Sequence, residues 1–269
     1  MPTATTKARP IIPWIGGKRR LVKHILPLIP PHQCYVEPFA GGAALFFLKP
    51  AKAKVEVLND INGDLINLYR IVQHHLPEFL RQFECLPASR EQFVSFQRAN
   101  PETMTDVQRA VRFYYLQHHA FGGKVTGQNF GTATTTPASD PLTATQALQT
   151  ARQRLSGVYI ERETWLQCMQ RYDRPHTFFY CDPPYWRTEG YGVPFAWSEY
   201  EALHDVMRQA QGAVLISIND HPDIRALFAG QHIKTLDITY SISRQKRGQK
   251  SGELLISNYP FPANERAKK

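Results

Sequence analysis

The segment Tyr180-Cys181-Asp182-Pro183-Pro184-Tyr185 combines a carboxylate, two rigid prolines and an aromatic ring at the end of an apolar run. The run 176–180 is typical of a buried strand, which must end at the prolines because they have no N–H to donate. Asp182 and the carbonyl of Pro183 could both accept hydrogen bonds from one amino group, while Tyr185 offers a face for stacking. We interpret the segment as a pocket for the exocyclic amine of an aromatic base; a simple turn is the alternative.

A second candidate site begins at Glu37-Pro38-Phe39-Ala40-Gly41-Gly42, which predicts a strand end, a tight glycine turn and a helix. In a doubly wound sheet this turn approaches a nucleotide-like ligand closely. The next predicted strand, 54–58, ends at Asn59-Asp60, where an acidic residue would be placed to hold ribose hydroxyls. These two strand ends predict an adenosine-sized ligand. The three spaced glycines of a dinucleotide fingerprint are absent, which disfavours a dehydrogenase.

The N-terminal loop 10–20 contains Gly16-Gly17 ahead of a predicted helix with apolar residues on one side. A glycine loop that carries Lys18 suits a carboxylate or phosphate ligand, although the full phosphate-loop spacing is missing. Trp14 is either a core residue or, beside two glycines, a stacking residue.

Composition indicates a folded protein with 42% hydrophobic and 20% charged residues among 269. This length allows one large domain or a main domain with an insertion, and we favour the second. No apolar run is long enough to cross a bilayer, and the first ten residues lack the apolar core of a secretory signal. We therefore expect a cytosolic protein.

The four cysteines, at positions 34, 85, 168 and 181, have neither zinc-ligand nor redox spacing, so we expect them to be small buried apolar groups. The doublets His74-His75 and His118-His119 are poor chelators because adjacent helical side chains point in different directions. We predict no metal site.

The net charge of +9 would attract a phosphate-rich partner at long range. Four cations, Arg244, Lys246, Arg247 and Lys250, stand within eight residues between the last two predicted strands. A solvated loop is the usual interpretation of such a run, but its place near the proposed pocket favours phosphate contact.

The remaining pattern alternates strands with helices and predicts a mostly parallel α/β sheet with ligands at the carboxyl ends of its strands. Strands are predicted at 157–160, 213–218, 233–238 and 253–257, and helices at 62–75, 77–83, 90–98, 105–119, around 165, at 199–210 and at 222–228. A polar stretch, 120–141, includes a small hairpin predicted around Gly127. It is either a surface that lies against DNA or a flexible loop.

Four motifs stand in the same order as in Dam-type DNA adenine methyltransferases, and the chain resembles that family over nearly its whole length. They are Trp14-Ile15-Gly16-Gly17-Lys18, Glu37-Pro38-Phe39-Ala40-Gly41-Gly42, Leu58-Asn59-Asp60-Ile61-Asn62 and Asp182-Pro183-Pro184-Tyr185. The resemblance implies a Rossmann-like doubly wound sheet and methyl transfer from S-adenosylmethionine to the exocyclic amine of adenine in double-stranded DNA. It also implies base flipping, which costs a few kcal/mol.

Residue roles follow from the same resemblance. Asp182, Pro183 and Tyr185 would be catalytic. The cofactor would be held by Trp14, Lys18, Glu37, Phe39, Ala40, Gly41, Asp60 and Asp182. DNA contacts are expected from Arg112, Phe121 and Lys124, together with the basic run at 244–250.

Residues 1–75 and 157–269 are expected to form the catalytic domain, and 76–156 a target-recognition insertion. We expect a monomer, encoded by a bacterium or a phage, with or without a paired restriction enzyme. Dam-type enzymes carry a Tyr-Asn pair where this chain has Phe121-Gly122, so an amide donor is missing. We therefore leave open whether specificity for GATC or a relaxed preference applies. The alternatives are an RNA or protein-amide substrate, and a noncatalytic DNA-binding relative.

Overall fold

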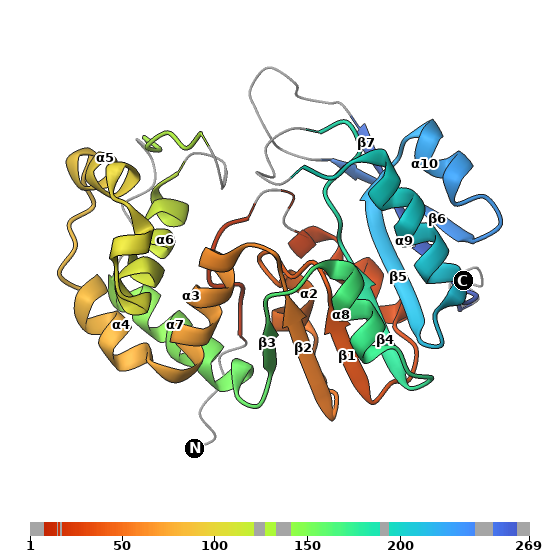
Figure 1. Cartoon of the computed structure of the whole chain (residues 1–269), viewed down its shortest axis with the longest axis horizontal. Helices are drawn as coiled ribbons and strands as arrows, with labels where there is room; N and C mark the ends of the chain where they lie inside the picture. The colour runs from red at the N-terminus through yellow and green to blue at the C-terminus, as the bar shows by residue number, and fades with distance from the viewer. Residues whose placement is uncertain are drawn as a thin grey trace, which may run out of the picture.

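The computed structural model describes residues 8–14, 16, 18–120, 127–132, 141–188, 194–239 and 250–262. These residues form a seven-stranded sheet in the order β3-β2-β1-β4-β5-β7-β6 (Figure 1). The strands are β1 (Cys34–Glu37), β2 (Val55–Asn59), β3 (Tyr159–Glu161), β4 (Thr177–Cys181), β5 (Ala213–Asn219), β6 (His232–Thr239) and β7 (Lys250–Ser257). Neighbours among β1 to β5 are parallel, whereas β7 is antiparallel to β5 and β6. The predicted α/β fold with a mostly parallel sheet is confirmed.

Helices cover both faces of the sheet, because successive side chains of each strand point to opposite sides. Tyr35 and Phe178 belong to one core, while the next residues along their strands, Val36 and Phe179, belong to the other. The first core includes residues of α1 and α2, and the second includes residues of α8, α9 and α10. These elements are η1 (Lys18–Arg20), α1 (Val22–Ile25), η2 (Leu26–Leu28), α2 (Ala44–Leu48), α8 (Trp165–Tyr172), α9 (Trp197–Gln209) and α10 (Pro222–Leu227).

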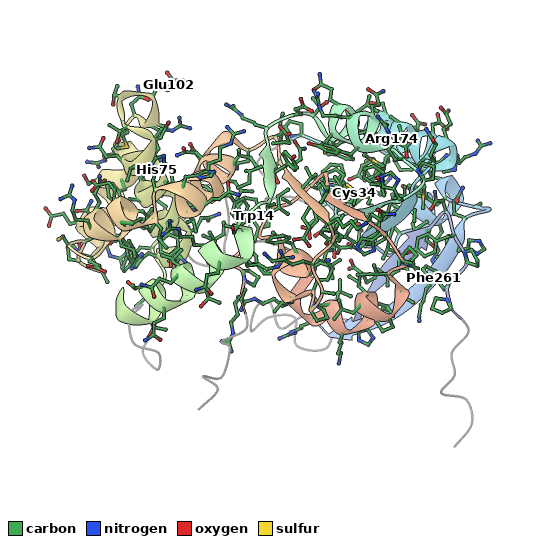
Figure 2. The ribbon with its side chains drawn as sticks, turned by 90° about the horizontal axis from the view of Figure 1, so that it is seen from below. Trp14, Cys34, His75, Glu102, Arg174 and Phe261 are labelled. Carbon is green, nitrogen blue, oxygen red and sulfur yellow. The ribbon has the colours of Figure 1, made fainter. Side chains whose placement is uncertain are left out.

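A group of helices lies beside α3 (Gly63–His74), beyond the β3 edge of the sheet (Figure 1). It contains α4 (Leu76–Phe83), α5 (Arg90–Arg98), η3 (Pro101–Thr103), α6 (Asp106–His119) and α7 (Pro141–Leu155). Helix α3 packs against α4, α6 and α7, so the core of the group is continuous with the core under α1 and α2. Trp14 lies between the helical group and the sheet (Figure 2), with its ring centroid 6.5 Å from that of Phe113 on α6.

Helix α7 was not among the predicted elements. It buries Ala144, Leu148, Ala151 and Leu155, which are spaced by four, three and four residues. This is the apolar period of an amphipathic helix, and the small alanines between polar residues made it weak in the sequence.

The predicted hairpin around Gly127 is only partly covered by the described residues. Ala120 and Phe130 form an antiparallel bridge, and the Gly131 amide donates to the His119 carbonyl at 2.7 Å. The chain therefore returns to the end of α6 after residues 121–126, which lie outside the described ranges.

The prediction that all four cysteines are buried is wrong for Cys85. Three of them are buried, but Cys85 is exposed, just beyond the end of α4. Its thiol donates to the carbonyl of Arg81 at 3.7 Å, within the last turn of that helix. A small polarizable residue is tolerated at such a helix end without a core to fill.

In the part of the chain that the structure describes, no helix has the length and apolar character needed to cross a membrane. The described residues also contain no group of three or more His, Cys, Asp or Glu side chains arranged to hold a metal ion.

Candidate active site

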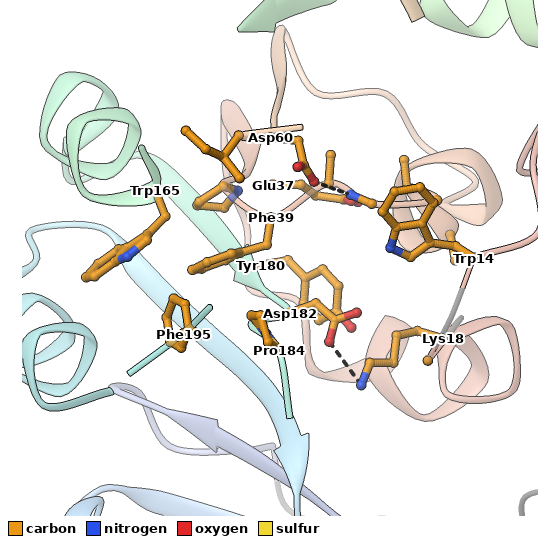
Figure 3. Close-up of a pocket in the computed structure, with 18 of the residues that line it drawn as sticks. Trp14, Lys18, Glu37, Phe39, Asp60, Trp165, Tyr180, Asp182, Pro184 and Phe195 are labelled. Carbon is orange, nitrogen blue, oxygen red and sulfur yellow. Dashed lines mark hydrogen bonds and ion pairs between the residues drawn. The ribbon is translucent and has the colours of Figure 1, made fainter. Parts of the chain in front are cut away.

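A cavity of about 360 Å³ opens at the carboxyl ends of β1, β2 and β4 (Figure 3). Sheet order reverses here, since β2 and β4 lie on opposite sides of β1, and such switch points are where α/β sheets bind ligands. The lining residues come from six segments: Trp14, Gly16 and Lys18; Glu37 to Leu45; Asp60 and Ile61; Thr164 to Leu166; Tyr180, Asp182 and Pro184; and Pro194, Phe195 and Glu199. Asp182 and the glycine turn therefore share one cavity, as the sequence predicted.

Asn59, the last residue of β2, joins the ends of three neighbouring strands at the cavity. Its side-chain amide donates to the carbonyls of Pro38 at 2.9 Å and Glu163 at 3.1 Å, and its Oδ1 accepts from the Glu163 amide at 2.9 Å. The residue is fully buried. Because an amide carries both donors and an acceptor, this one side chain fixes β1, β2 and β3 relative to one another.

The glycine turn is held by Asp60 and Trp14. Gly41 has φ of +47°, and its amide donates to Asp60 Oδ2 at 2.9 Å. The Gly41 carbonyl accepts from the hydroxyl of Tyr69 at 2.6 Å. A Cβ atom on Gly41 would lie 2.7 Å from Nε1 of Trp14, so only glycine fits under the indole. Gly41 thus contacts both Trp14 and Asp60, two other residues predicted to hold the cofactor.

Asp60 uses both carboxylate oxygens on the backbone, because Oδ1 also accepts from the Asn62 amide at 2.9 Å. Burial raises the pKa of Asp60, and the amide donors oppose that rise. A carboxylate oxygen can accept more than one hydrogen bond. The side chain lines the cavity, where it retains capacity for a ligand hydroxyl.

Glu37, the last residue of β1, is a buried carboxyl that lines the cavity. Its Oε1 accepts from the hydroxyl of Tyr35 at 2.6 Å and from the amide of Phe46 at 2.8 Å. Burial raises the pKa of Glu37 to about 8, and the charge of Asp182 adds to the rise. A cationic ligand in the cavity would relieve both effects.

An aromatic slot forms the other side of the cavity. The rings of Phe39 and Trp165 are stacked, with centroids 6.0 Å apart and planes at 23°, and Phe195 meets Phe39 edge-on at 5.7 Å. The indole N–H of Trp165 donates to Glu199 Oε2 at 2.7 Å. Sequence reasoning found Phe39 but missed Trp165, Phe195 and Glu199. The one available signal was an aromatic residue at the start of a helix directly after a strand end.

The corner after β4 is fixed by four side chains from other elements. Tyr200 donates to the Pro184 carbonyl at 2.7 Å, and the Asn219 side chain bonds both backbone groups of Trp186, at 2.9 and 3.1 Å. Asp182 Oδ1 lies 3.0 Å from Nζ of Lys18 and accepts from Ser217 Oγ at 3.3 Å. Fixed geometry at this corner is what a positioning site requires.

Two of the predicted catalytic residues are not part of the cavity lining. Pro183 is buried, and Tyr185 is partly buried with its hydroxyl in contact with Lys18 and Glu253. Lys18, predicted to contact the cofactor, lines the cavity but directs its ammonium toward Asp182 and Glu253. Tyr185 therefore lies outside the cavity lining, next to Lys18, which is part of that lining.

Burial raises the pKa of Asp182 to about 6, Lys18 lowers it, and Glu253 raises it again. The pKa of Asp182 is higher in the folded protein than in the unfolded chain. Folding is therefore less favourable when Asp182 is ionised: the full cost to stability applies above about pH 6, and there is no cost below about pH 4. At about pH 7.5 we expect Asp182→Asn to increase the free energy of unfolding by about 1–2 kcal/mol, allowing for partial exposure of the side chain. Urea unfolding at about pH 7.5 and 4.5 measures this; equal stability of both proteins at the higher pH would contradict it.

Most of the predicted DNA-contacting residues cannot be placed. Phe121, Lys124, Arg244, Lys246 and Arg247 lie outside the described residues, as does the side chain of Lys250, the first residue of β7. Arg112 is described, and its Nε donates to the carbonyl of Phe96 at 2.6 Å, where burial lowers its pKa. This contact ties α6 to α5.

Comparisons with known proteins show which family the chain resembles. Residues 14–242 match the family model of the D12 class N6 adenine-specific DNA methyltransferases. A DNA N-6-adenine-methyltransferase of Escherichia phage P1 is 30% identical over 87% of this chain, which spans 33% of that longer protein. A DNA adenine methylase of Serratia marcescens is 26% identical over 94% of this chain and 99% of its own length. A type II methyltransferase of Lactococcus lactis subsp. cremoris is 26% identical over 93% of this chain and 95% of its own length. With the family motifs gathered around one cavity, the chain belongs to the D12 class of N6 adenine-specific DNA methyltransferases.

Proposed function

We propose that the chain transfers the methyl group of S-adenosylmethionine to the exocyclic amine of a flipped adenine in double-stranded DNA. The observation that supports this most is the single cavity that joins the glycine turn, Asp60 and Asp182. Its volume of about 360 Å³ falls within the usual range for small-molecule sites, roughly 300–1,000 Å³.

The chemistry of the lining fits this methyl donor. A planar purine matches the slot beside Phe39 and Trp165, and ribose hydroxyls match the remaining acceptor capacity of Asp60. Burial disfavours the ionised forms of Glu37 and Asp182 and raises the pKa of both carboxyls, and a cationic ligand in the cavity would stabilise those ionised forms. When bound, S-adenosylmethionine would supply a methyl group on a positively charged sulfur.

The catalytic role of the protein is then mainly to position the acceptor. Asp182 and the Pro183 carbonyl would accept hydrogen bonds from the adenine amine and draw its lone pair out of conjugation. The carboxylate would also stabilise the positive charge that develops on the nitrogen, which would then lose one of its two protons to solvent. Stacking on Tyr185, worth about 1–3 kcal/mol, would offset the cost of flipping the base. This mechanism needs no covalent enzyme intermediate.

We assign target recognition to residues 76–156, which include the helical group α4 to α7. The location of this group beyond the β3 edge leaves it outside the cavity lining. Within residues 76–156, the guanidinium of Arg90, at the start of α5, lies 5.0 Å from the ring centroid of Phe130. Sequence preference, whether for GATC or relaxed, stays a prediction, because Phe121-Gly122 lie outside the described residues.

The direct test offers tritium-labelled S-adenosylmethionine to duplex DNA, RNA and protein in parallel. We expect label in DNA, recovered as N6-methyladenine after digestion, and a rate that falls steeply with salt because phosphate contacts release counterions. Label only in RNA or protein would overturn the proposal, and so would failure to bind the methyl donor. Sequencing the modified bases in DNA from cells that express the protein would then identify the preferred site.

The aromatic slot gives a prediction about cofactor affinity. Trp165→Leu should raise the Kd for S-adenosylmethionine about tenfold, because it removes a stacking face worth roughly 1–3 kcal/mol. At saturating cofactor, kcat should change little, since the proposed role of the ring is to hold the cofactor and not the adenine amine. Trp165→Phe is the control: it keeps a ring and loses only the bond to Glu199. Isothermal titration calorimetry measures the Kd for S-adenosylmethionine in each variant. Equal Kd values for Trp165→Leu and wild type would contradict the assignment.

A further inference from the structure

A buried charged cluster of Lys18, Tyr185 and Glu253 lies beside Asp182, and Glu253 is the member that sequence reasoning did not find. Glu253 is fully buried on β7, where it pairs with Asn219 of β5 and Leu236 of β6. The alternating residues Leu254 and Leu255 belong to opposite cores. The side chain of Glu253 thus points to the same face as Leu255, the face on which η1 places Lys18.

The carboxylate of Glu253 connects the other members of the cluster. Its Oε1 accepts from Nζ of Lys18 at 2.8 Å, and its Oε2 accepts a short hydrogen bond from the hydroxyl of Tyr185. Lys18 also contacts that hydroxyl, and its Nζ lies 4.0 Å from the centroid of the Tyr185 ring. The same ammonium is 3.0 Å from Oδ1 of Asp182. One lysine is therefore shared by two carboxylates.

A glutamate at this position must offset the cost of burial through its partners. Burying a charged carboxylate is costly unless it is paired, and replacing a buried ion pair with apolar residues is often neutral or stabilising. The following residues of β7, Leu254, Leu255 and Ile256, show that the strand otherwise accommodates apolar side chains in both cores. Among the described residues, the contacts of Glu253 lead to Tyr185 and, through Lys18, to Asp182.

We propose that Glu253 is a positioning residue for methyl transfer. Its hydrogen bond with the Tyr185 hydroxyl fixes the ring on which the flipped adenine stacks. Its ion pair with Lys18 positions the ammonium that also pairs with Asp182. This inference rests on the proposed roles of Tyr185 and Asp182.

The charges around Asp182 give the proposal a second readout. The titratable groups that face it among the described residues are Lys18 of η1, Glu37 of β1, Tyr180 of β4, Glu253 of β7 and the neighbouring Tyr185. Asp182 must be ionised to attract the amine, so the wild-type rate should fall as pH drops through about 6. Removing the negative charge of Glu253 takes away a repulsion on Asp182 and leaves Asp182 as the remaining carboxylate paired with Lys18. The pKa of Asp182 should therefore fall.

The test compares wild type with Glu253→Gln, which keeps the size of the side chain and removes its charge. We expect kcat to fall at least about tenfold, while the Kd for S-adenosylmethionine stays within about twofold, because the cofactor side of the cavity is unchanged. With 2-aminopurine in place of the target adenine, the fluorescence rise on binding should be smaller. The acid limb of the kcat profile should move to lower pH.

Ser257→Ala is the matched control, since it removes a buried polar group from the same strand, one that bonds the Tyr259 carbonyl outside the cavity. If Glu253→Gln does not fold, Tyr185→Phe removes the hydroxyl that Glu253 holds and keeps the ring, and it should show the same loss of fluorescence. Wild-type kcat and fluorescence in Glu253→Gln, or equal losses in Ser257→Ala, would overturn the inference. A wild-type protein that does not methylate DNA would instead refute the proposed function.

Discussion

Asp182→Ala is expected to lower kcat for DNA adenine methylation by about 10³-fold, the size of effect seen when a group that stabilises developing charge is removed. The variant loses the acceptor that holds the amine and the negative charge that opposes the positive charge on the attacked nitrogen. The Kd for S-adenosylmethionine should rise far less than kcat falls, because the glycine turn, Asp60 and the Phe39–Trp165 slot remain and only one of the two carboxylates that face the charged donor is lost. Single-turnover methyl transfer and calorimetry together separate the two effects.

The control for this experiment is Asp173→Asn. Asp173 is also a described aspartate near β4, but at its amino end, where its carboxylate accepts from the amides of Gln211 and Gly212 at 3.0 and 2.9 Å. The change should cost stability and leave kcat unchanged. If Asp182→Ala kept the wild-type rate on DNA, the assignment of the base pocket to this corner would be wrong.

Gly41→Ala is expected to weaken binding of S-adenosylmethionine by at least about 100-fold, the second largest effect. Part of the cause is backbone strain, since a residue with φ of +47° costs about 1 kcal/mol when it carries a Cβ. The larger part is steric: the new atom would lie 2.7 Å from Nε1 of Trp14 and 2.9 Å from its Cδ1. The indole, which lines the cavity, or the turn that Asp60 holds must then move.

Gly157→Ala separates these two causes. Gly157 also has positive φ, +77°, but nothing lies within 4 Å of the place where its Cβ would be. It should cost about 1 kcal/mol of stability through strain and leave cofactor affinity unchanged. The thermal shift produced by saturating S-adenosylmethionine measures affinity in both variants. A wild-type shift in Gly41→Ala would show that the glycine turn does not contact the donor.

Local pattern was sufficient for the framework of the molecule. Apolar runs that end at proline or at Asn59-Asp60 predicted the strands that position the site, to within a few residues for β1, β2 and β4, and the helix predicted over 90–98 has the bounds of α5. These signals are short-range, because strand burial, helix period and proline chemistry act within a few residues. Helix α7 was missed because its buried face includes two alanines, which give a weak apolar signal.

The order of motifs along the chain also identified the two strand ends that meet at the cavity, because parallel strands of an α/β sheet present their carboxyl ends together. The placement of the glycine turn, Asp60 and Asp182 around one volume follows from that rule. Their roles in catalysis and cofactor binding stay predictions, which the variants above address.

The sequence by itself determined the fold class, the family and the two motifs that share the cavity, since each depends on contiguous residues whose chemistry is local. Only the tertiary structure decided which distant side chains complete the site. Glu253 lies 235 positions from Lys18 along the chain, and Trp165 reaches Phe39 from another strand end. Such pairs leave no periodic trace in the sequence, because Glu253 meets Lys18 only when β7 pairs with β5, and Trp165 meets Phe39 only when the start of α8 packs against the turn after β1.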